Sequence, residues 1–166
     1  VDASVPKPFD IIFISYNEPN ADKNYRLLLD RFPRAKRLHG VKGIHNAHIE
    51  AARLSTSDMF WVVDGDAIIE PNFNFEFDQI LKQDTYTKNI VHVWRSRNPI
   101  NNLEYGYGGV KLLPRDLTIN MDTTKADMTT SISPSFKVMP EISNISAFNT
   151  DEFNTWKSAF RECCKL

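Results

Sequence analysis

Two aspartates separated by one glycine, Asp64-Gly65-Asp66, follow directly on an apolar run of the chain, Met59 to Val63. In an extended backbone, residues two apart point to the same side, so both carboxylates face one point. Carboxylates held this close repel each other unless a proton or a cation lies between them. A hard cation, Mn²⁺ or Mg²⁺, neutralises such a pair and bridges it to phosphate oxygens. The motif therefore predicts a metal site at Asp64 and Asp66, with a solvated turn after an edge strand as the alternative.

The elements that must position this pair are indicated by the hydrophobic pattern of the first half. Apolar and β-branched runs predict strands, and apolar residues at helical spacing predict helices. They alternate as strand, helix, strand, helix and strand over residues 11–14, 25–32, 35–39, 44–54 and 59–63. This order is typical of an α/β fold with a mostly parallel sheet flanked by helices. In such sheets ligands bind beyond the carboxyl ends of the strands, where the acidic pair stands.

The second half is less regular in pattern. We expect a short helix over residues 73–81, strands at 90–94 and 110–113, and a loop from about 116 to 135, which is rich in Thr, Ser and Asp. A final helix is predicted from Asn149, because Asn149 and Glu152 have the spacing of a capping box.

Two further segments accompany the acidic pair in order along the chain. Phe13 to Glu18 joins the first strand to a Tyr-Asn-Glu turn, and Lys42 to Ala47 leads into a helix with Glu50-Ala51-Ala52. Together with Asp64-Gly65-Asp66 they resemble glycosyltransferases of the GT-A fold, especially the large group similar to family 2. The resemblance covers about the first 70 residues. It departs from the family in one respect, since only about fifty residues separate the first strand from the acidic pair.

The resemblance implies a metal-dependent transfer of a sugar from a nucleotide-sugar donor, a UDP-sugar above all, to an acceptor hydroxyl. It places the turn Tyr16-Asn17-Glu18 at the base and ribose of the donor. It places Lys42 and Asn46 near the donor, with Lys42 on the diphosphate. Asp64 would meet ribose or metal, and Asp66 the metal directly.

A segment of aromatic residues and glycines, Tyr105 to Gly109, is the next candidate. Gly108 and Gly109 permit close approach of the backbone to a donor sugar, and a plain β-turn is the alternative. The segment is flanked by four cationic side chains that could neutralise a diphosphate, namely Arg95, Arg97, Lys111 and Arg115. Further candidates for metal ligands are the histidines His39, His45, His48 and His92.

The predicted catalytic base is a carboxylate at the start of the last helix, Asp151 or Glu152. Enzymes of the GT-A fold that invert configuration use such a group to deprotonate the acceptor hydroxyl. Acidic residues in the first turn of a helix also stabilise it through the helix dipole, which is the alternative role.

The composition is that of an ordinary globular protein, with 166 residues, 42% of them hydrophobic, and a net charge of −1. We expect a single domain over residues 1–166; the start at Val1 and the helical pattern at the end make a fragment of a longer chain the alternative to a whole protein. The longest apolar runs are too short to span a bilayer, so no membrane span is expected. The adjacent Cys163 and Cys164 indicate reduced thiols and a cytoplasmic protein.

The acceptor is open between a glycan, a protein and, less expected, modified DNA. Two other functions remain as alternatives. A haloacid-dehalogenase-like phosphatase would use Asp64 as nucleophile and Asp66 as acid and base, although Ile68 stands where those enzymes have Thr or Val. A noncatalytic binding domain of GT-A type would keep the fold without the chemistry.

Overall fold

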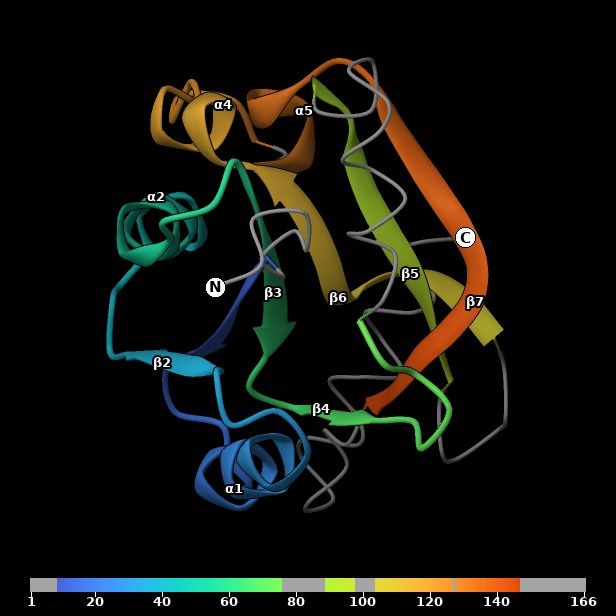
Figure 1. Ribbon diagram of the computed structural model, residues 1–166. Helices are drawn as coiled ribbons and strands as arrows, with labels where there is room; N and C mark the ends of the chain where they lie inside the picture. Colours follow the sequence, from blue (N-terminus) through green and yellow to red (C-terminus); the bar gives the residue numbers. More distant parts are fainter. Residues whose placement is uncertain (1–8, 76–88, 98–103, 127, 147–166) are drawn as a thin grey trace, which may run out of the picture.

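The computed structural model describes residues 9–75, 89–97, 104–126 and 128–146 (Figure 1). The strands are β1 (Asp10–Ser15), β2 (Lys36–His39), β3 (Met59–Asp64), β4 (Ala67–Ile69), β5 (Val91–Arg97), β6 (Glu104–Pro114) and β7 (Phe136–Ser146). The helices are α1 (Ala21–Arg31), α2 (Ile44–Leu54), α4 (Arg115–Ile119) and α5 (Met128–Ile132). The predicted α/β fold is confirmed, and the first half follows the predicted order of strands and helices.

The strands form one seven-stranded sheet in the order β2-β1-β3-β6-β5-β7-β4. β2, β1 and β3 are parallel to one another, as predicted for this half. Beyond them the sheet is mixed, because β6 is antiparallel to β3 and β5, and β7 is parallel to β5 and antiparallel to β4. Only Gly65 and Asp66 separate β3 from β4, yet β4 lies at the far edge, so the sheet must curl to bring that edge back towards β3 (Figure 1).

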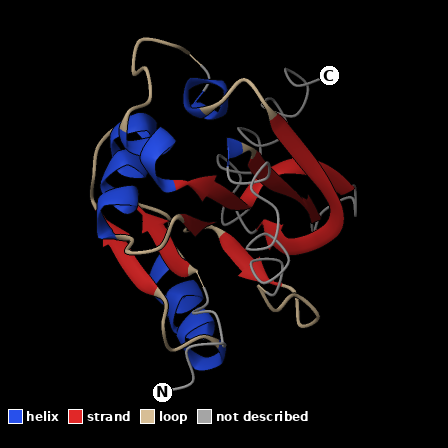
Figure 2. Cartoon of the chain, turned by 45° about the horizontal axis from the view of Figure 1, so that its top comes forward, coloured by secondary structure: helices blue, strands red, loops and turns tan. Residues whose placement is uncertain are grey.

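Helices cover both faces of the sheet (Figure 2). Side chains alternate along each strand, so Ile11 and Phe13 of β1 pack on the face of α1, with Leu28. Ile12 and its neighbours on β3 pack on the opposite face, with Ala51 of α2 and residues of α4 and α5. Each helix therefore buries its apolar side against one face, and the turn at the end of β3 lies between these two layers.

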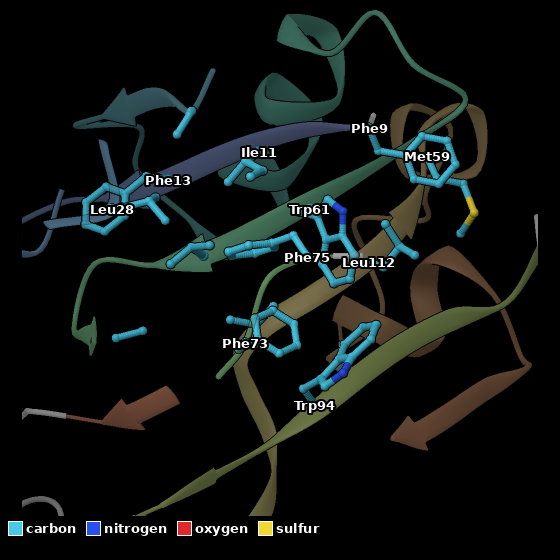
Figure 3. Close-up of a cluster of buried hydrophobic side chains, with 14 of the residues drawn as sticks. Phe9, Ile11, Phe13, Leu28, Met59, Trp61, Phe73, Phe75, Trp94 and Leu112 are labelled. Atoms are coloured by element: carbon cyan, nitrogen blue, oxygen red, sulfur yellow. The ribbon is translucent and has the colours of Figure 1, made fainter. Parts of the chain in front are cut away.

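Four aromatic rings fill the concave side of the curled sheet (Figure 3). Trp61 of β3 and Trp94 of β5 lie 4.8 Å apart between ring centroids. Phe73 and Phe75 pack edge-on against Trp61, at 5.8 and 5.1 Å. The predicted helix over 73–81 is therefore not seen at its start, because residues 73–75 are non-helical and held in this core; residues 76–88 are outside the described part.

The loop predicted over 116–135 was wrong, since α4 and α5 lie within it. Each helix has only five residues, too few to show a helical period, and each is held by burial, through Thr118 in α4 and Met128 and Ile132 in α5. The strands predicted at 90–94 and 110–113 are confirmed as parts of β5 and β6. β6 is longer than predicted and takes in residues 105–109, so that segment is strand and not a turn.

Candidate functional site

A pocket of about 430 Å³ opens at the carboxyl ends of the parallel strands β1 and β3, beside the start of α2. This volume is in the ordinary range for small-molecule sites, about 300–1,000 Å³. The pocket is lined by Ile14, Ser15, Tyr16, Glu18, Val41, Lys42, Gly43, Ile44, Ala47, His48, Asp64, Gly65, Asp66 and Lys111. Most of the predicted donor-site residues are thus brought together from segments far apart in the sequence.

The Asp64-Gly65-Asp66 turn is held from both sides. Asn24 of α1 is buried and donates its amide N–H to the Gly65 carbonyl at 3.0 Å. On the other side the Glu18 carboxylate lies against Gly65, where an added Cβ would meet Glu18 Oε2 at 2.8 Å. Glu18 Oε2 also accepts the Tyr16 N–H at 2.7 Å, a hydrogen bond within the loop after β1 that fixes this carboxylate beside the turn. Glycine at position 65 is therefore what lets the two loops meet.

Three carboxylates meet at this pocket, and their charges are only partly compensated. The Lys111 ammonium lies 3.6 Å from Asp64 Oδ1 and is itself buried. Burial raises the pKa of Asp64 and outweighs the opposing effect of Lys111. Burial, and then the charges of Asp64 and Glu18, raise the pKa of Asp66 to about 6. Asp66 is thus a carboxylate in a setting that disfavours its own charge.

These side chains fit a divalent cation that arrives with a phosphate ligand. Among the described residues, no three His, Cys, Asp or Glu side chains form a metal-binding cluster. Mg²⁺ usually takes only one or two protein carboxylates and completes its shell with water and substrate phosphates. Asp64 and Asp66 supply that donor set, and the charge of a cation would offset both the burial and the repulsion that raise the pKa of Asp66.

Asp66→Asn is expected to stabilise the metal-free protein above pH 6. The pKa of Asp66 is about 6 in the folded chain against an ordinary 3.8, so the folded state holds the extra proton and stability falls as the pH rises through this window. Above this pH window the charged Asp66 side chain destabilises the folded protein by on the order of 1–3 kcal/mol, and asparagine removes this destabilisation. Urea unfolding in EDTA at pH 4 and pH 7.5 measures the gain. An equal gain at both pH values would contradict the assignment.

The other predicted donor-site residues divide into two groups. Tyr16, half exposed, and Lys42 line the pocket as the resemblance implied. Asn17 and Asn46 are exposed and do not line it, and Asn46 donates to the Lys42 carbonyl at 3.4 Å.

The glycines predicted at the donor sugar, Gly108 and Gly109, lie on β6, and Gly109 is not among the described residues that line the pocket. Gly109 has a structural reason to be glycine, because a side chain there would overlap the buried amide of Asn144. Gly108 lies beside it on the same strand. The catalytic candidates Asp151 and Glu152 and the helix predicted from Asn149 lie outside the described residues.

The flanking cations are separated by the fold. Lys111 reaches the pocket because β6 pairs with β3 so that Lys111 lies opposite Val62, two residues before Asp64. Arg97 instead pairs with Glu70 at 3.1 Å, and Arg115 donates to the Ser55 carbonyl at 2.9 Å. Nothing in the local sequence distinguishes Lys111 from these arginines, since only the antiparallel pairing selects it.

Asn24 was missed by the sequence analysis, although a signal was present. It falls on the buried side of α1 with Ala21 and Leu28, at i, i+3 and i+7. A polar residue on the apolar side of a helix is typical of a specific buried hydrogen bond. Here that bond holds the carbonyl of Gly65, between the two aspartates of the predicted metal site.

No family model matches the chain, and no curated protein matches it. Solved structures do resemble it, at low identity. The bifunctional IspDF from Campylobacter jejuni has a TM-score of 0.53 at 9% identity, over 81% of this chain and 50% of that chain. The 4-diphosphocytidyl-2C-methyl-D-erythritol synthase from Anaerococcus prevotii has a TM-score of 0.50 at 10% identity, over 93% and 96%. An inositol-1-phosphate CTP transferase from T. maritima has a TM-score of 0.50 at 10% identity, over 92% of this chain and 77% of that chain.

The chain has the Rossmann-like fold of these proteins. It spans half the length of the bifunctional one. Identities near 10% show a shared fold and leave the activity to be argued from the site. The resemblance to glycosyltransferase family 2 stays a prediction. Within the described ranges, no helix is long and apolar enough to cross a membrane.

Proposed function

We propose that this chain is a metal-dependent glycosyltransferase, which moves a sugar from a nucleoside diphosphate donor to an acceptor hydroxyl. The observation that carries the proposal is the meeting of Glu18, Asp64 and Asp66 at one pocket of suitable volume, with Lys111 beside them. The pocket lies at the carboxyl ends of β1 and β3, where this class of fold binds its ligands.

Each side chain has a task that its position supports. Asp64 and Asp66 would hold Mn²⁺ or Mg²⁺, and the bound ion supplies neutralisation of the diphosphate as the leaving group departs. Lys111 and Lys42 line the same pocket and add positive charge for phosphate oxygens. Tyr16 is 48% exposed at the pocket and offers an aromatic face to a base or a sugar.

The remaining steps rest on residues outside the described part. Asp151 or Glu152 is the predicted base that takes the proton from the acceptor hydroxyl as its oxygen attacks the anomeric carbon. The acceptor is a glycan, a protein or modified DNA, and the donor nucleotide is predicted to be UDP.

A second candidate, nucleotidyl transfer from a nucleoside triphosphate, is favoured by the names of two of the similar structures. A triphosphate is usually cradled by backbone N–H groups of a glycine-rich loop with a basic side chain. The loop after β1 has neither, since it reads Tyr16-Asn17-Glu18-Pro19-Asn20. The Glu18 carboxylate would repel the additional phosphate, so the site favours a diphosphate donor.

The products distinguish these functions. With Mn²⁺ and a panel of UDP-sugars, the protein is expected to release UDP slowly by donor hydrolysis, and faster when the acceptor is present. With UTP or CTP and sugar 1-phosphates it is expected to release no pyrophosphate. Chromatography of the nucleotides and a pyrophosphate assay measure both.

Other products would overturn the proposal. Pyrophosphate release would establish nucleotidyl transfer, and hydrolysis of p-nitrophenyl phosphate without any nucleotide would establish a phosphatase. Binding of UDP-sugars by the intact chain without turnover, with every class of acceptor tried, would leave a noncatalytic binding domain.

A further inference from the structure

His48 is a buried histidine of the pocket, and one of its ring nitrogens has no hydrogen-bond partner. It lies on α2, is 3% exposed and lines the pocket that holds Asp64 and Lys111. Its Nδ1 lies 2.7 Å from the Ile44 carbonyl oxygen. A carbonyl oxygen only accepts, so the proton is on Nδ1 and Nε2 presents a lone pair. That Nε2 is buried and has no hydrogen-bond partner.

The ring stays neutral in the free protein. Burial first, and then the positive charge of Lys111, lower the pKa of His48 to about 3. His48 is therefore an acceptor and not a further cation for phosphate. A buried acceptor without a donor destabilises the free protein, and that cost is recovered when a ligand supplies an N–H or O–H.

We propose that His48 determines the specificity of the nucleotide pocket, by accepting at Nε2 a hydrogen bond from an N–H or O–H group of the bound nucleotide. The inference rests on the proposed function, because it requires that the pocket bind a nucleotide. Two groups of a uridine nucleotide have the required chemistry, the N3–H of the base and the hydroxyls of the ribose. Ligands without the matching donor leave Nε2 unpaired and bind more weakly.

Calorimetric titration with UDP and Mn²⁺ tests the proposal. His48→Phe keeps a ring of similar size and removes the acceptor, so it is expected to weaken UDP binding roughly tenfold. His48→Gln keeps an acceptor near the position of Nε2 and is expected to stay within about threefold. His45→Phe is the matched control: His45 lies on the same helix, also has a buried Nε2 without a partner, and does not line the pocket. It is expected to bind UDP as the wild type does.

Three analogues identify the donor group. N3-methyl-UDP lacks the base N–H, and 2′-deoxy-UDP and 3′-deoxy-UDP each lack one ribose hydroxyl. The analogue that lacks the group bound by His48 is expected to bind wild type and His48→Phe equally, whereas the other two retain the tenfold difference. A difference of the same size with all three analogues would overturn the proposal.

A measurement on the wild-type protein covers the case in which His48→Phe fails to fold. In a nitrogen-15 spectrum of the histidine rings, the Nε2 resonance of His48 is expected to move on addition of UDP, because its lone pair gains a hydrogen bond. An unmoved resonance at saturating UDP, or unchanged affinity in a folded His48→Phe, would overturn the inference and leave the proposed function standing. A wild-type chain that binds no nucleotide would overturn the proposed function and the inference with it.

Discussion

Asp66→Asn is expected to abolish Mn²⁺-dependent binding of UDP, with a loss of affinity of about 100-fold or more. The amide keeps the shape of the carboxyl and removes one of the two anionic ligands of the predicted site. The raised pKa shows that this charge is unfavourable in the metal-free protein. A cation would reverse that balance, because the two carboxylates that repel each other would then share its charge. Titration calorimetry with UDP, with and without Mn²⁺, measures the loss.

The same substitution separates stability from function. It is expected to make the metal-free protein more stable at pH 7.5 while removing metal-dependent binding, a combination that simple unfolding cannot produce. Asp116→Asn is a suitable control, since that carboxylate is 89% exposed on α4 and lies outside the pocket. UDP binding of equal strength with and without Mn²⁺ in the wild type would refute the metal site.

The dependence on pH follows from the same carboxyl. Below its pKa of about 6, Asp66 is increasingly protonated in the metal-free protein, and a cation must displace that proton in order to bind. Metal-dependent UDP binding is thus expected to weaken as the pH falls from 7 to 5, about tenfold per pH unit below the pKa. The coupling between Mn²⁺ and protons distinguishes a carboxylate site from binding through Lys42 and Lys111 alone.

The first half of the fold was predictable because its elements are local and strongly patterned. The apolar runs of β1 and β3 are long enough to indicate buried strands, and the apolar spacing of α1 and α2 indicates helices packed on a sheet. Parallel strands joined by helices then leave few arrangements, and in the one observed Asp64 lies at the carboxyl end of β3 beside the end of β1. The placement of Glu18 with the acidic turn at one site came from the resemblance to GT-A glycosyltransferases and not from the strand pattern.

The second half depends on contacts between residues distant in sequence, which no local pattern contains. Strand β4 has three residues and pairs with β7, which is far along the chain. The choice of Lys111 as the cation of the site depends on the register of β6 against β3. The aromatic cluster likewise takes Phe73 and Phe75 from a segment whose spacing suggested a helix. In each case packing against a distant element overrides the local preference.

Gly109 has a structural role that the sequence analysis did not predict, for a related reason. Glycine permits close approach of the backbone to many kinds of group, and a neighbouring side chain is one that the sequence does not reveal. In the structure the approaching group is the Asn144 side chain from β7, fully buried, which accepts hydrogen bonds from Ser96 at 3.0 Å and Ser143 at 2.8 Å. Gly109 therefore leaves room for the Asn144 side chain where β5, β6 and β7 meet.

Gly109→Ala is accordingly expected to destabilise the protein by about 2–3 kcal/mol, because the new methyl group would overlap an amide that is held in place by hydrogen bonds. Urea unfolding at pH 7.5 measures the change. Gly40→Ala is the comparison: an added Cβ there meets nothing within 4 Å, and only the backbone angle φ of +81° is unfavourable. That substitution is expected to cost only about 1 kcal/mol.

The cause of the Gly109 effect can be isolated by removing the group that the methyl would strike. Asn144→Ala alone is expected to destabilise the chain, since Ser96 and Ser143 lose their acceptor. In that background, however, Gly109→Ala places its methyl group in vacated space, so its own cost is expected to fall below about 1 kcal/mol. If the two substitutions were instead additive, the glycine would be required for something other than Asn144. Close approach of the backbone to a ligand, as first predicted for this segment, would then again be the explanation for glycine at position 109.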